Sequence, residues 1–109
     1  MVQIVTSDED LLDLRDRLVE EVGRQRALGV ILDVTGLDVM DSFSARTLRD
    51  LALMVRLRGA ETVIVGIQPE VAFTMVQLGL TLEGVSTALD LEQGLAMLDA
   101  AAKKRGRPR

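Results

Sequence analysis

The sequence predicts one α/β domain built on a mostly parallel sheet. Short apolar runs alternate with longer segments in which apolar residues recur every three or four positions, and this strand–helix order repeats four times. The chain has 109 residues, enough for one compact core. It is 48% hydrophobic and 28% charged, a composition typical of folded domains rather than disordered chains.

The first half of the chain contains two strand–helix pairs. Residues 2–5 form a short apolar run, and the following serine and aspartate, Ser7 and Asp10, have the spacing of a capping box. The helix that follows is expected to end near Gly23, and its apolar stripe consists of Leu11, Leu14, Leu18 and Val22. Residues 30–34 read as a strand covered on both faces, and a helix is expected from about Ser42 to Arg58.

The second half repeats the pattern. Residues 61–67 predict another buried strand, and Pro69 suits the first turn of a helix that Gly79 would close. Residues 86–89 are a weaker strand candidate. Asp90 is then expected to cap a last helix with Leu91, Leu95 and Leu98 on its apolar side.

The absence of certain residue types and segments narrows the classes of function that the chain can have. The chain has no cysteine and no histidine, which removes thiol catalysis and the commonest general base, and no serine has a suitable base beside it. No apolar stretch reaches the roughly 20 residues of a membrane-spanning helix, and no secretory signal is visible. We therefore expect a cytoplasmic protein without enzymatic activity, cofactor or membrane partner.

The turn before the second long helix holds the most informative serine. Ser42 follows Asp41 at the expected helix N-terminus, where backbone N–H groups and the helix dipole favour negative charge. It is open at this point whether Ser42 is an ordinary N-cap or a phosphate acceptor, since aspartate and serine both cap well. Ser44 and Thr47 are alternative acceptors, although ordinary first-turn roles suit them better.

The sequence resembles the STAS domain of bacterial anti-sigma-factor antagonists, and most closely the single-domain stressosome scaffold proteins of the RsbS type. Three segments carry the resemblance: GVILDVTGLDVMDSF at 29–43, AETVIVGIQPEVAFTMVQLGL at 60–80 and TALDLEQGLAML at 87–98. The resemblance implies four helices on a four- to five-stranded sheet. STAS domains usually place two strands before the first helix, whereas only about five residues precede it here. Residues 1–102 are interpreted as a STAS domain, and it is open at this point whether the first strand is missing.

The resemblance also implies a phospho-switch. A serine-protein kinase of the anti-sigma type would phosphorylate Ser42, a phosphatase would reverse the modification, and related STAS sensor proteins would co-assemble with the chain. The unmodified protein would sequester its kinase-like partner, and phosphorylation would release it. The predicted partner-binding residues are Asp38, Val39, Met40, Asp41, Phe43, Arg46 and Arg49.

The acidic residues and the apolar residues around Ser42 each have two interpretations. Asp33, Asp38 and Asp41 could be read as a magnesium-binding set, but solvated loop carboxylates explain them better, so we expect no metal site. Among the apolar neighbours of Ser42, at least one is expected in the core. An exposed Phe43 or Met40 would instead suit a partner contact.

The chain ends in a basic segment. Residues 103–109, KKRGRPR, contain five cations, whereas residues 1–102 hold eight cations against seventeen acidic residues, a net charge of −9. We expect a disordered tail that solubilises the domain, and no DNA partner. The alternative function is DNA tethering through an AT-hook-like motif, with minor-groove contacts from Arg105, Gly106, Arg107 and Pro108.

Overall fold

The computed structural model describes residues 1–77, Gly79 and residues 85–104, and the sheet within it has four parallel strands. They lie in sequence order, β1-β2-β3-β4, and each pairs with its neighbour in parallel. This confirms the predicted α/β class with its mostly parallel sheet. The strand bounds are β1 Val2–Ile4, β2 Gly29–Asp33, β3 Glu61–Val65 and β4 Ser86–Ala88.

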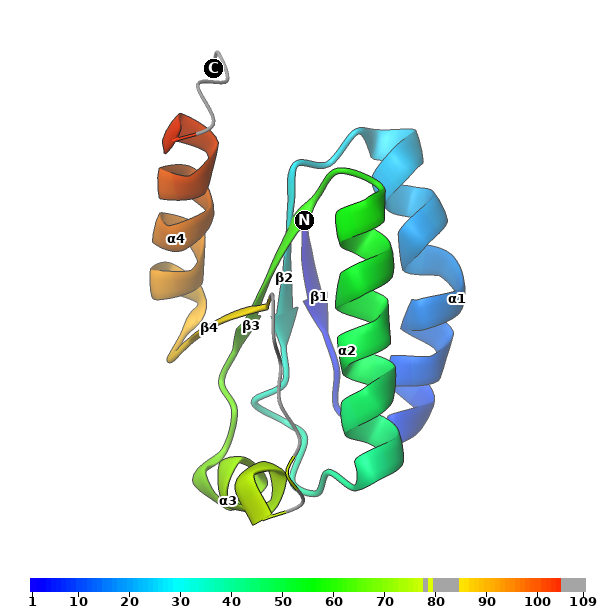
Figure 1. The fold of residues 1–109 in the computed structure, drawn as a ribbon, viewed down its shortest axis with the longest axis vertical. Coiled ribbons are helices and arrows are strands. Elements are labelled where there is room, and N and C mark those ends of the chain that lie inside the picture. The colour runs from blue at the N-terminus through cyan, green and yellow to red at the C-terminus, as the bar shows by residue number, and fades with distance from the viewer. Residues whose placement is uncertain (78, 80–84, 105–109) are drawn as a thin grey trace.

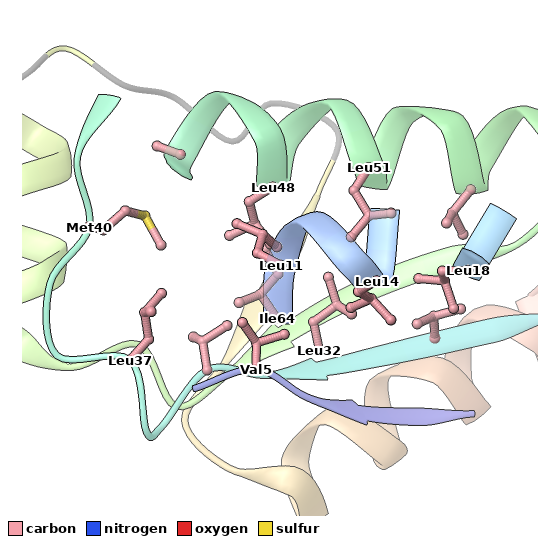
Figure 2. Packing of buried hydrophobic residues seen from close by; sticks show 14 of the residues in the cluster. Val5, Leu11, Leu14, Leu18, Leu32, Leu37, Met40, Leu48, Leu51 and Ile64 are labelled. Carbon is pink, nitrogen blue, oxygen red and sulfur yellow. The ribbon is translucent and has the colours of Figure 1, made fainter. Parts of the chain in front are cut away.

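Helices cover both faces of the sheet. The helices α1 (Asp8–Gln25) and α2 (Ser42–Leu57) lie side by side on one face, and α4 (Leu91–Lys104) lies on the other (Figure 1). The main core fills the space between the sheet and the first two helices, as Figure 2 shows. It includes the predicted apolar stripes of both helices, among them Leu11, Leu14, Leu18, Leu48 and Leu51.

The second face is packed closely because α4 has a glycine where it crosses the sheet. A Cβ atom on Gly94 would lie 2.8 Å from Val65 Cγ1, so a larger residue would push α4 away from β3. Ile31, Val63 and Val65 form the buried cluster on this side, with Met97 and Leu98 of α4 packed against it.

The short helix α3 (Pro69–Gln77) lies beyond the end of β3 and packs on the loop between β2 and α2 (Figure 1). Val71 and Met75 of α3 are buried in the same cluster as Leu37 and Met40 of that loop. The Gln68 side-chain amide also donates to the Thr35 carbonyl at 2.7 Å. These contacts fix the loop that leads to Ser42.

The end of the domain differs from the prediction. The helix α4 continues through Lys104, so Lys103 and Lys104 belong to it rather than to a disordered tail. Lys103 makes an ion pair with Asp99 one turn earlier, and both lysines favour a helix C-terminus, where the dipole attracts cations. The remaining residues of the predicted tail, 105–109, lie outside the described residues.

Among the helices that the structure describes, none combines the length and the apolar character that a bilayer crossing requires.

Candidate functional site

The candidate site is the loop between β2 and α2, together with the first turn of α2. In a parallel α/β fold the carboxyl ends of the strands and the N-termini of the helices share one end of the molecule. Here β2 ends at Asp33, the loop occupies residues 34–41, and α2 begins at Ser42 near the lower end of Figure 1. The topology therefore presents this loop next to the start of α1 and to α3.

Asp41, not Ser42, is the N-cap of α2. Its backbone is extended, with φ −100° and ψ −178°, and its Oδ1 accepts the Ser44 backbone N–H at 2.8 Å. Ser42 is the first residue of the helix and is exposed, and no hydrogen bond of its hydroxyl occurs within the described part of the chain. The interpretation of Ser42 as a plain N-cap is therefore wrong, because the preceding carboxylate already fills that role.

Ser44 joins the N-termini of two helices. Its side chain is 1% exposed, and its Oγ lies 2.7 Å from Asp8 Oδ1 of α1 and 3.0 Å from Asp41 Oδ1. A serine hydroxyl has one proton to donate, so the two carboxylates share it. Asp8 was not among the predicted site residues, because its contact with Ser44 joins residues 36 positions apart and leaves no local signal in the sequence.

The other hydroxyl of this turn is also occupied. Thr47 is buried, and its Oγ1 donates to the Phe43 carbonyl at 2.9 Å, one helical turn earlier. Of the three hydroxyls considered as acceptors, only that of Ser42 is exposed.

The same hydrogen bonds stabilise the charged form of the cap. The Ser44 backbone N–H, followed by the Ser44 hydroxyl, lowers the pKa of Asp41 below its usual value. Hydrogen bonds donated to a carboxylate favour its ionised form. At neutral pH the residue before Ser42 is thus an anion, held by the first turn of α2.

Apolar side chains flank Ser42 on the surface. Val39 is 75% exposed and Phe43 is 50% exposed. Exposed side chains of this kind suit a protein contact, since aromatic residues are enriched at interfaces. Of the four charged residues predicted to bind a partner, Asp38, Asp41 and Arg46 are exposed. Arg49 is partly buried, and its Nε lies 3.6 Å from Asp50 Oδ1.

Met40 is buried, whereas a role in partner binding would require an exposed side chain. Its side chain is only 2% exposed and points from the loop into the core (Figure 2). It packs in the cluster that also holds Leu37, Val71 and Met75. Met40 therefore anchors the loop to the core and is not part of the candidate binding surface.

Two of the three carboxylates considered as magnesium ligands, Asp33 and Asp41, accept backbone hydrogen bonds. Asp33 Oδ1 accepts the Thr35 N–H at 3.0 Å, and Asp41 caps α2. Over residues 1–77, 79 and 85–104, no group of three or more histidine, cysteine, aspartate or glutamate side chains could hold a metal ion. The candidate DNA contacts Arg105, Gly106, Arg107 and Pro108 lie outside the described residues.

Known proteins are similar to this chain in sequence and in fold. Residues 11–93 match the family model of the STAS domain. The chain is 35% identical over 82 residues to the RsbT co-antagonist protein RsbRA of Bacillus subtilis, a match covering 75% of this chain and 30% of that protein. The chain thus corresponds to less than a third of the length of this relative.

Two solved structures match over nearly the whole chain. A serine-to-glutamate variant of RsbS from Moorella thermoacetica superposes with a TM-score of 0.80 at 31% identity, covering 94% of this chain and 89% of that one. A chain from a structure describing the molecular architecture of the stressosome gives a TM-score of 0.78 at 30% identity, covering 94% and 91%.

The two serines of the first turn of α2 provide a matched pair of alanine substitutions. We expect Ser44→Ala to lower the free energy of unfolding by about 1.5–3 kcal/mol, because it removes a buried hydroxyl shared by two carboxylates. Ser42→Ala should change it by less than about 0.5 kcal/mol, since that side chain is exposed. Urea denaturation followed by circular dichroism measures both. Equal losses would contradict the assignment of the cap.

The cap also predicts a pH dependence. Because the folded-state pKa of Asp41 is lowered, the unfolded chain binds a proton first as pH falls. The stabilisation from this group is complete above the unfolded value near 3.8 and is lost as pH falls through the folded pKa. Asp41→Asn retains a capping side chain without this titration.

We therefore expect Asp41→Asn to lose less stability than the wild type between pH 5 and pH 3, as measured by urea denaturation at each pH. Parallel losses in the two proteins would show that the Asp41 carboxylate contributes nothing to the acid sensitivity.

Proposed function

Because the chain belongs to the STAS-domain family, we propose that it is a non-enzymatic phospho-switch of the anti-sigma-factor antagonist or stressosome type. In this proposal the unmodified protein holds a serine-protein kinase of the anti-sigma type, and phosphorylation of Ser42 releases it. A phosphatase restores the binding form. The switch operates in the cytoplasm, where its kinase has ATP.

The observation that carries the proposal is the exposed hydroxyl of Ser42 at the first position of α2, which has no hydrogen-bond partner among the described residues. It is exposed, whereas the neighbouring Ser44 and Thr47 hydroxyls are buried and hydrogen-bonded. A kinase needs an acceptor oxygen that can enter its active site. In this turn only Ser42 meets that requirement without unfolding of the helix.

Electrostatics supports release without loss of the fold. A phosphate adds a charge of about −1.5 to −2 and three acceptor oxygens. The N-terminus of α2 favours such a group, because its backbone N–H groups and dipole are positive there. A partner covering Val39 and Phe43 would instead meet a new charge and its hydration shell beside Asp38 and Asp41.

The relatives support the choice of partners. One is named a co-antagonist of RsbT, and one matching structure is of the stressosome. We therefore propose an RsbT-type kinase as the partner and related STAS proteins as co-assembling subunits.

The proposal is tested by incubating the protein with its kinase and ATP, followed by mass spectrometry of the peptides. We expect a single phosphate on Ser42, and none on Ser42→Ala. Phosphate mainly on Ser44 or Thr47 would refute the site, since both hydroxyls are buried.

A binding measurement completes this test. Ser42→Asp should weaken kinase binding by at least about tenfold while the circular dichroism spectrum is unchanged. Ser86→Asp adds the same charge at an exposed position on β4, and should bind as the wild type does. Equal affinities for both variants would contradict release by charge at Ser42.

A further inference from the structure

Four arginines gather at the end of the domain opposite Ser42. Arg24 and Arg26 lie at the C-terminus of α1, and Arg56 and Arg58 lie at the C-terminus of α2. The two helices run side by side in the same direction, so their C-termini meet at the upper end of Figure 1. These four residues, here called the basic end, are half of the eight cations in residues 1–102.

The basic end has no carboxylate partner within the described ranges. All four arginines are exposed, and none takes part in an ion pair there. Three of the other four arginines of residues 1–102 are paired, namely Arg15 with Asp16, Arg17 with Glu21 and Arg49 with Asp50. The helix dipoles favour cations at C-termini, but leave these side chains available for a ligand.

One of these arginines reaches back to the end of α1. The Arg58 guanidinium lies against the backbone of α1 at Gly23, where a Cβ atom would overlap it. Arg58 and Arg26 then line one shallow pocket together with Ala27 and Leu28.

Apolar side chains lie among these charges. Leu57, between Arg56 and Arg58 in the chain, is 87% exposed, and Leu28 beside the pocket is 44% exposed. An apolar centre within a charged rim is typical of protein interfaces. A nucleic acid would use the arginines but not the leucines, and the chain has no tryptophan or tyrosine for base stacking. A protein surface rich in carboxylates is the better fit.

The chain itself carries such a surface. On the outer face of α1, Glu9, Asp13, Asp16 and Glu20 are all exposed. Their spacing of four, three and four residues puts them in one line along the helix, here called the acidic stripe. The partly buried Leu12 and Val19 lie on the same helix and add apolar surface.

We propose that the basic end of one copy docks on the acidic stripe of a second copy. The two surfaces differ, so the contact is head-to-side and can continue from copy to copy. This inference rests on the co-assembly in the proposed function and names the surfaces that would carry it. It does not depend on Ser42, which lies at the other end of α2 from Arg56 and Arg58.

Sedimentation velocity of the full chain tests the proposal. The wild type should self-associate at 50 mM NaCl, with an association constant about tenfold lower at 500 mM, because salt screens exposed charges. The double variants Arg56→Glu/Arg58→Glu and Asp13→Lys/Glu20→Lys should each lose about tenfold alone. An equimolar mixture of the two should associate again, since each supplies the surface that the other has reversed.

A matched control lies outside both surfaces. Glu70→Lys/Glu92→Lys makes the same change in net charge as Asp13→Lys/Glu20→Lys, at exposed positions in the first turns of α3 and α4, and should leave self-association at the wild-type level. Circular dichroism checks that every variant is folded.

Several results would overturn the inference. These are a wild type that stays monomeric at 50 mM salt, association that salt and both charge reversals leave unchanged, or a mixture that does not recover. Wild-type binding to a short DNA duplex that Arg56→Glu/Arg58→Glu abolishes, without self-association, would assign the basic end to nucleic acid instead. Phosphorylation of Ser42 in these variants reports separately on the proposed function.

Discussion

The hydrogen bond from the Ser44 amide to the Asp41 carboxylate is the interaction on which the candidate site depends. At 2.8 Å it caps α2 with the residue before Ser42, so the Ser42 hydroxyl is not needed for the cap. The Ser44 hydroxyl then ties this cap to Asp8 at the start of α1. Two serines in the first turn of α2 thus differ in role. Ser44 holds the structure together, and Ser42 is available for chemistry.

The parallel topology extends this separation to the whole domain. Helix N-termini meet at one end and helix C-termini at the other, so residues that complement the helix dipoles are sorted by charge. Asp8, Asp41 and Glu70 lie in first turns or caps, whereas Arg24 and Arg56 lie in last turns. In the proposed switch, the backbone N–H groups at the start of α2 would accommodate a phosphate on Ser42. The basic end lies at the C-termini of α1 and α2, so the two proposed binding surfaces are separate.

The order of strands and helices follows from the sequence because apolar periodicity is local, and each run identifies its own element. The cap was ambiguous because Asp41 and Ser42 are adjacent and both suit that position. Met40 is buried in a cluster that includes Val71 and Met75 of α3, a later part of the chain, so its burial leaves no local signal in the sequence. The Asp8–Ser44 contact is likewise long-range. The last helix runs further than expected because the alanines at 100–102 and the two lysines after them are good helix formers.

In the proposed switch, α2 accepts a dianion at its first residue with the fold intact. The most direct test compares amide nuclear magnetic resonance spectra of the protein before and after phosphorylation by its kinase. We expect shifted resonances confined to the loop of residues 34–41 and the first turn of α2, with β2, β3 and α4 unchanged. Shifts spread through the sheet, or loss of resonance dispersion, would show that phosphorylation disrupts the domain and would contradict the claim.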